Sequence, residues 1–148
     1  QASCMGGAYL AGLDLASVEK LGRYGFGLGM AFQIVDDCLD LTGETETLGK
    51  KAGLDLTKRD MTLPLLYLFE SLSPVERARL VSNFQLSPPE KLFDEVRALA
   101  QRHRSVEKAL EVARRYAADA SAVLKDFPSS APTESLAHLA DYCLERVR

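Results

Sequence analysis

The chain has 148 residues, of which 47% are hydrophobic and 26% charged, and its formal net charge is −3. This composition provides enough apolar material for a core and predicts one soluble globular unit. The negative charge, without a long run of Lys or Arg, excludes a nucleic-acid-binding surface, and no apolar run reaches the roughly 18 residues of a transmembrane helix. The 3 cysteines have unrelated spacings. They favour free thiols in a reducing cytosol over a disulfide framework or a zinc site, so we expect a cytoplasmic protein.

Two helices are predicted at the start of the chain. Small residues favour a helix over residues 2–11, and a second helix runs from a cap at Asp14 or Ser17 to the pair Thr42-Gly43. Glycines crowd this second helix and would cost it roughly 0.8–1 kcal/mol each relative to alanine. At that cost they indicate that a neighbouring helix approaches the backbone closely. These glycines are Gly22, Gly25, Gly27 and Gly29.

The rest of the chain is also predicted to be helical. Residues 43–59 lack a steady apolar period, which favours a loop or a broken short helix. Ser-Pro pairs then mark helix starts, and an apolar stripe with steps of three and four residues marks one buried face, with a break near residues 101–105. No alternating strand pattern occurs, so the predicted fold class is all-α. The predicted elements are a helix at 60–72, helices that begin at Ser73-Pro74 and Ser87-Pro88-Pro89, the stripe from Leu92 to Phe127, a linker at 128–132, and a terminal helix to Val147 capped by Thr133 or Ser135.

A group of aspartates is set into an apolar run, Phe32-Gln-Ile-Val-Asp36-Asp37-Cys-Leu-Asp40. Aspartate is a poor helix former and costly to desolvate, so a partner must compensate these charges. On a helix, Asp36 and Asp40 project from one face with roughly 5–6 Å between their Cβ atoms. Such oxygen ligands suit Mg²⁺, which takes one or two protein carboxylates together with substrate phosphates. The alternative interpretation is the solvated stripe of an amphipathic helix.

Four blocks of sequence occur together in this chain: residues 29–40 around the aspartates, 49–56 (Gly-Lys-Lys-Ala-Gly-Leu-Asp-Leu), 62–65 (Thr-Leu-Pro-Leu) and, upstream, 7–12 (Gly-Ala-Tyr-Leu-Ala-Gly). Together they resemble the trans-type isoprenyl (polyprenyl) diphosphate synthases. The resemblance is to the family's second aspartate-rich motif, the loop and helix that follow it, and a small-residue helix before it. It covers residues 6–68, and the later part of the chain fits the family's C-terminal helices in pattern.

This resemblance implies an isoprenoid-synthase-type helical bundle, of which residues 1–148 would form a single all-helical unit, the C-terminal part. Members condense isopentenyl diphosphate with an allylic diphosphate in isoprenoid biosynthesis, and Mg²⁺ neutralises the departing diphosphate. The family's N-terminal part, with its first aspartate-rich motif, has no counterpart in these residues. We therefore expect the parent protein to be a prenyltransferase and a homodimer, and this chain alone to be inactive.

The resemblance also implies roles for the matching residues. Members commonly carry a second lysine at the position of Asp60, and here Lys58 or Arg59 would supply the missing positive charge. Asp37 is expected to support or pair with the metal ligands, because its side chain points elsewhere on the helix. The implied roles are Mg²⁺ binding by Asp36 and Asp40 with Asp37 beside them, catalysis by Gln33 and Lys50, and substrate binding by Phe32, Gln33, Lys50 and either Lys58 or Arg59.

Two other functions are compatible with parts of the pattern. A non-catalytic short subunit, which pairs with a full-length synthase, is the alternative, but the chain starts at Gln1 within a helical segment, which argues against it. A terpene cyclase is disfavoured, since those enzymes usually carry an Asn/Asp-Ser/Thr-Glu triad where this chain has a plain DDxxD motif after Phe-Gln. The preferred interpretation is the C-terminal portion of a polyprenyl diphosphate synthase.

Overall fold

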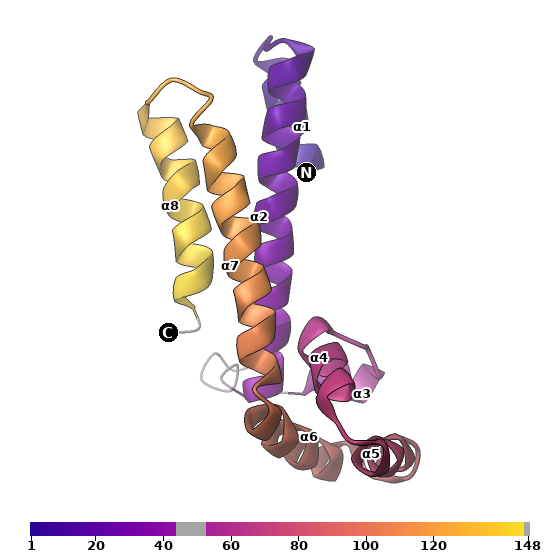
Figure 1. Ribbon diagram of the computed structural model, residues 1–148. Coiled ribbons are helices and arrows are strands. Elements are labelled where there is room, and N and C mark those ends of the chain that lie inside the picture. Colours follow the sequence, from indigo (N-terminus) through magenta and orange to yellow (C-terminus); the bar gives the residue numbers. More distant parts are fainter. Residues whose placement is uncertain (44–52, 147–148) are drawn as a thin grey trace. The chain divides into compact units, whose positions relative to one another are not determined.

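A computed structural model describes residues 1–43 and 53–146. All regular secondary structure in these ranges is helical, which confirms the predicted all-α class (Figure 1). No helix within the described ranges is long and apolar enough to cross a membrane. In chain order the helices are α1 (Ala2–Leu10), α2 (Leu15–Thr42), α3 (Leu54–Lys58), α4 (Leu63–Ser71), α5 (Pro74–Leu86), α6 (Pro89–His103), α7 (Ser105–Leu124) and α8 (Ala131–Glu145).

The chain divides into two compact units. The first comprises residues 1–35 and 112–148, and the second comprises residues 36–111. Both divisions fall inside a helix, so α2 and α7 contribute residues to both units. The expectation of a single all-helical unit stays a prediction.

Most helix ends follow the predicted signals. Asp14 rather than Ser17 caps α2, because its Oδ1 accepts a hydrogen bond of 2.7 Å from the Ser17 backbone N–H. Gly12 and Gly43 follow α1 and α2 with φ of 75° and 84°, a left-handed conformation that glycine adopts without a steric penalty. Arg104, with φ of 53°, separates α6 from α7 at the break predicted in the apolar stripe.

The terminal helix begins earlier than predicted. Ser130 is the N-cap of α8 and forms a capping box with Thr133. The predicted caps Thr133 and Ser135 are therefore wrong, since both residues lie inside the helix. By contrast, the predicted cap Ser73 is confirmed by a capping box with Glu76 at the start of α5.

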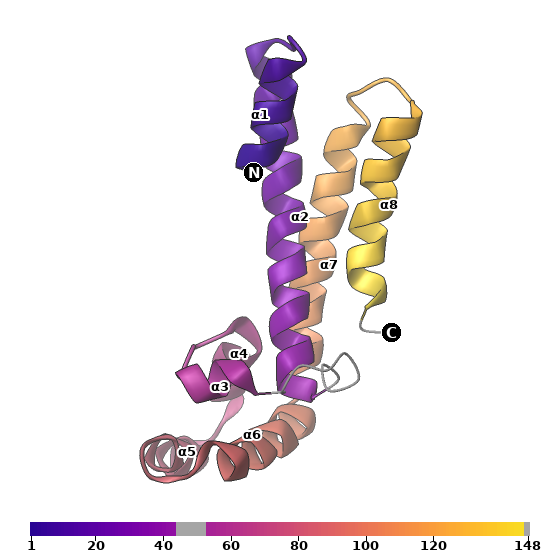
Figure 2. The same cartoon turned by 180° about the vertical axis from the view of Figure 1, so that it is seen from behind.

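Close helix packing in the first unit explains most of the glycines on α2. A Cβ added to Gly22 or to Gly25 would lie 2.7 Å from a side-chain atom of α1. One added to Gly27 would lie 2.9 Å from the Tyr116 carbonyl oxygen of α7, whereas nothing lies within 4 Å of one added to Gly29. In both views α1 lies beside α2, and α8 lies beside α7 (Figure 1 and Figure 2). The prediction of close packing is thus confirmed at Gly22, Gly25 and Gly27.

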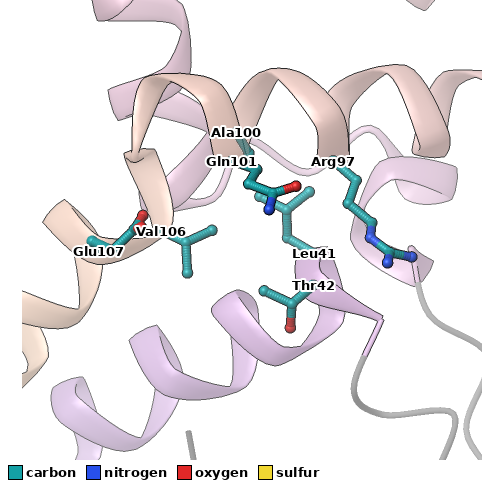
Figure 3. Close-up of a pocket in the computed structure, with 7 residues that line it drawn as sticks. All are labelled: Leu41, Thr42, Arg97, Ala100, Gln101, Val106 and Glu107. Atoms are coloured by element: carbon teal, nitrogen blue, oxygen red, sulfur yellow. The ribbon is translucent and has the colours of Figure 1, made fainter.

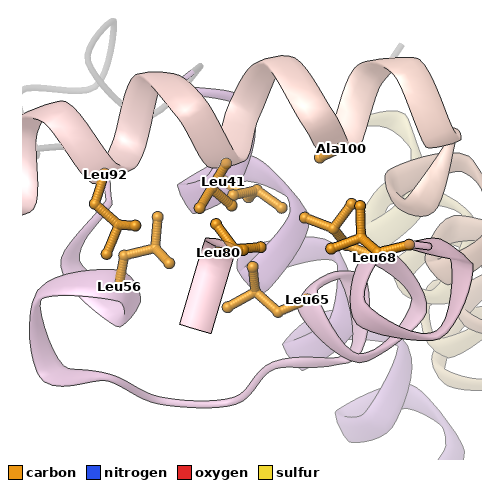
Figure 4. Packing of buried hydrophobic residues seen from close by; sticks show 9 residues of the cluster. Leu41, Leu56, Leu65, Leu68, Leu80, Leu92 and Ala100 are labelled. Carbon is orange, nitrogen blue, oxygen red and sulfur yellow. The ribbon is translucent and has the colours of Figure 1, made fainter. Parts of the chain in front are cut away.

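The second unit has its own apolar core, in which α6 packs against α3 and α4. Gly53 precedes α3 with φ of 76°, and a Cβ added there would lie 2.6 Å from Cδ2 of Phe93 in α6. This close approach fixes α3 against α6. The residues buried in this core are Leu41, Leu56, Leu65, Leu68, Leu72, Leu80, Leu92, Val96 and Ala100 (Figure 4).

Candidate functional site

The aspartates of the predicted site lie in the last turns of α2. Asp36, Asp37 and Asp40 are each half-buried, while the intervening Cys38 and Leu39 are only 1% and 4% exposed. The carboxylates are therefore held at the edge of a packed helix rather than along a fully solvated stripe.

Asp40 accepts hydrogen bonds from the start of α3. Its carbonyl oxygen accepts from Gly53 N–H at 3.2 Å. Its Oδ1 accepts from Leu54 N–H and its Oδ2 from Asp55 N–H, each at 3.1 Å. Asp40 thus caps α3, which the sequence did not predict because the donors to its carboxylate lie 14 and 15 residues further along the chain. Binding of Mg²⁺ by Asp40 stays a prediction.

Asp55 adds another carboxylate to this region. Burial raises the pKa of Asp55, and the negative charges of Asp40, Asp37 and Asp60 raise it further, while the charge of Lys58 lowers it. Carboxylates from α2 and from the segment at α3 therefore act on one another within the second unit. Asp55 was not among the predicted site residues. Its position in the block 49–56 was the only available signal.

Removal of the Asp55 charge should stabilise the chain at neutral pH. Because the pKa of Asp55 is raised in the folded state, ionisation above the unfolded pKa of about 3.9 favours the unfolded chain. We expect Asp55→Asn to raise Tm by about 1–3 °C at pH 7, a small effect because the charge is largely solvent-screened. The gain should shrink as the pH falls towards 4.

Scanning calorimetry between pH 4 and pH 7 measures this effect. Asp94→Asn, at an exposed position on α6, is the matched control for loss of one carboxylate. A gain from Asp55→Asn that is the same at both pH values would contradict an electrostatic origin.

The two predicted cations, Lys58 and Arg59, lie at the end of α3, and their role in substrate binding stays a prediction. Lys58 ends α3, and its charge acts on Asp55. Arg59 is the C-cap of α3 and has a left-handed φ of 62°. Asp60 donates its backbone N–H to the Asp55 carbonyl oxygen at 2.8 Å. The predicted residue Lys50 lies outside the described residues.

Phe32 and Gln33 precede the aspartates by one turn on α2, and both side chains are exposed in the first unit. The Arg146 guanidinium lies 5.0 Å from the centroid of the Phe32 ring, a cation–π contact. Phe32 also lines an apolar cavity of about 410 Å³ together with Leu28 and Tyr142. An isoprenoid chain needs an apolar wall of this kind. The substrate roles of Phe32 and Gln33 stay predictions.

Another cavity, of about 250 Å³, adjoins the end of α2 in the second unit. Figure 3 shows Arg97 of α6 projecting beside Leu41 and Thr42 of α2. Arg97 and Glu107 bring opposite charges to the lining of this cavity. Their charges balance, so the cavity offers little net attraction to a diphosphate, and the candidate site remains with the aspartates.

Cys38, the cysteine within the aspartate motif, does not contribute a reactive thiol to this site. All three cysteines are free thiols, as predicted. Burial, and then the charge of Asp37, raises the pKa of Cys38 to about 12, so its thiol stays protonated at neutral pH. Within the ranges 1–43 and 53–146, no group of three or more His, Cys, Asp or Glu side chains could by itself hold a metal ion. A cation here would need ligands from its substrate, as Mg²⁺ often does.

Comparison with known proteins identifies the family. The sequence matches the polyprenyl synthetase family over residues 1–101. A prenyl transferase from Cyanophora paradoxa is 38% identical over 146 residues, which cover 99% of this chain and 44% of that protein. Polyprenyl synthase from Caulobacter crescentus CB15, in a complex with calcium and isoprenyl diphosphate, has a TM-score of 0.88 and 38% identity over 97% of this chain and 44% of that one. Geranylgeranyl pyrophosphate synthase from Corynebacterium glutamicum, in a complex with the same two ligands, has a TM-score of 0.80 and 34% identity over 95% of this chain and 44% of that one.

The chain thus spans less than half the length of these relatives. The matched segment includes the aspartates of α2, all of α3 to α5 and most of α6. The likeness of the backbones confirms the isoprenoid-synthase-type fold that the resemblance implied. The chain belongs to the polyprenyl synthetase family.

Proposed function

We propose that this chain forms one wall of the active site of a prenyltransferase that condenses isopentenyl diphosphate with an allylic diphosphate. The observation that carries the proposal is the group of carboxylates in the second unit, where Asp37 and Asp40 of α2 act on Asp55 of α3. The reaction class is supported by relatives named prenyl transferase and polyprenyl synthase. The parent protein would act in isoprenoid biosynthesis.

Together with oxygens of a bound diphosphate, the carboxylates at the end of α2 could hold a divalent cation. Burial raises the pKa of Asp55, and the negative charges of Asp40, Asp37 and Asp60 raise it further, so these carboxylates repel one another to some extent. An oxygen-only donor set suits Mg²⁺ or Ca²⁺, and a cation would relieve this repulsion. Asp36 would hold Mg²⁺ directly, with Asp37 supporting it. When bound, Mg²⁺ supplies charge neutralisation for the diphosphate leaving group.

The remaining residues have separate tasks under this proposal. Gln33 presents its amide to the reacting substrates, and Phe32 lines the path of the isoprenoid chain. Lys58, and Lys50 in the same way, offers a mobile positive charge to diphosphate oxygens. In the reaction the allylic C–O bond ionises, the alkene of isopentenyl diphosphate attacks the allylic cation, and a proton leaves. The reaction needs no oxidant or reductant, because one C–O bond breaks, one C–C bond forms, and diphosphate and a proton are released.

The isolated chain should not catalyse this condensation, because the family's first aspartate-rich motif is not among its residues. We expect no elongated product when the purified chain is incubated with radiolabelled isopentenyl diphosphate, farnesyl diphosphate and Mg²⁺. A chimera, in which this chain replaces the matching part of the C. crescentus polyprenyl synthase, should elongate the allylic substrate. Its activity should be lost when EDTA removes the divalent cation.

Two results would count against the proposal. Elongation by the isolated chain would contradict the assignment of a single wall of the site. A chimera that folds, as judged by circular dichroism and gel filtration, and still shows no elongation would contradict the prenyltransferase assignment. The unaltered C. crescentus enzyme is the positive control for both assays.

A further inference from the structure

The carboxylate of Asp40 is engaged by the protein's own donors. Its two oxygens each accept a backbone N–H of α3 at 3.1 Å. Each carboxylate oxygen therefore has a backbone donor from within the protein itself. A third link, from Gly53 N–H to the Asp40 carbonyl oxygen at 3.2 Å, joins the same two segments.

The helix that Asp40 caps, α3, is also packed against the core of the second unit. Leu56 of α3 is only 3% exposed and belongs to the core of the second unit. The Thr57 hydroxyl donates to the Gly53 carbonyl oxygen at 3.0 Å. With five residues, α3 is too short to be stable without tertiary contacts. The start of α3, which carries Asp55, is therefore placed by Asp40 on one side and by the core on the other.

We propose that Asp40 is a positioning residue of the prenyl transfer site, whose carboxylate caps α3 and thereby sets where Asp55 and Lys58 stand relative to Asp37. Cation binding is then the task of Asp36, with Asp37 supporting it. This inference rests on the proposed function, and it differs from the metal-ligand role that the family resemblance implies for Asp40. The last aspartate of the motif organises the site, while the first binds the ion.

Amide hydrogen exchange of the isolated chain, without metal or substrate, tests the cap. Asp40→Ala removes both acceptors, so the amides of Leu54 and Asp55 should exchange at least about tenfold faster. Asp40→Asn keeps one acceptor and should have a smaller effect. Asp36→Asn removes a charge from the same helix and should leave both amides unchanged. The proposal would be overturned if the Leu54 and Asp55 amides were unprotected in the unsubstituted chain. It would also be overturned if Asp40→Ala left their exchange rates unchanged.

The Mg²⁺ dependence of the chimera tests the division of tasks. Asp36→Asn should raise the Mg²⁺ concentration for half-maximal elongation at least about tenfold. Asp40→Asn should lower kcat while leaving that concentration within about twofold, because the ion's own ligands are intact. An Asp40→Asn variant that needs as much Mg²⁺ as Asp36→Asn would overturn the positioning role. If the unsubstituted chimera shows no elongation, the proposed function fails, and the positioning role fails with it. The exchange experiment on the isolated chain still decides whether Asp40 caps α3.

Discussion

Substitution of Asp36 by asparagine should reduce kcat/KM for prenyl chain elongation by at least about 100-fold. Asparagine keeps the size of the side chain and one oxygen, but it removes the negative charge with which aspartate holds a divalent cation. Because Asp36 is half-buried on α2, water can only partly take the place of the lost carboxylate oxygen beside the cation. The measurement is incorporation of radiolabelled isopentenyl diphosphate by the chimera with and without the substitution.

The control for this prediction is Asp94→Asn, which removes the same charge from an exposed position on α6. Its kcat/KM should stay within about threefold of the unsubstituted chimera, since surface charges contribute little. Circular dichroism of both variants separates loss of chemistry from loss of fold. An Asp36→Asn variant that keeps more than a tenth of the activity would show that Asp36 is not the principal ligand of the cation.

Features that depend on nearby residues could be predicted from the sequence. The caps Asp14 and Ser73 bond to backbone N–H groups three residues away, so spacing alone identifies them. The error at α8 has a local cause as well. Pro132 was expected in a linker, but it lies in the first turn of α8, where proline is tolerated because its missing N–H has no partner to lose. The true cap, Ser130, precedes that turn.

Features that depend on distant contacts could not be predicted. The motif itself indicated Asp36, Asp37 and Asp40, because their spacing is a property of one helix. The hydrogen bonds from the start of α3 to the Asp40 carboxylate join residues that are 14 and 15 positions apart. The spacing of residues within one helix cannot predict such a contact. Local sequence thus indicates candidate ligands, while tertiary structure decides how these side chains are arranged.

Replacement of Gly27 by alanine should lower the free energy of unfolding of the isolated chain by about 1–3 kcal/mol. The added Cβ would lie 2.9 Å from the Tyr116 carbonyl oxygen and 3.1 Å from the Cβ of Ala120. A backbone oxygen cannot rotate away as a flexible side chain can, so α7 would have to shift. That shift would disturb the core of the first unit, to which Ala120 and Tyr24 both belong.

Gly29→Ala is the matched control, because it adds the same methyl group to the same helix two residues later. Nothing lies within 4 Å of that Cβ, so the higher helix propensity of alanine should raise the free energy of unfolding by up to about 1 kcal/mol. Urea denaturation of the two variants should therefore give shifts of opposite sign. If the glycines served only to make α2 flexible, both substitutions would stabilise the chain. Stabilisation by Gly27→Ala would thus contradict close packing between α2 and α7 at this position.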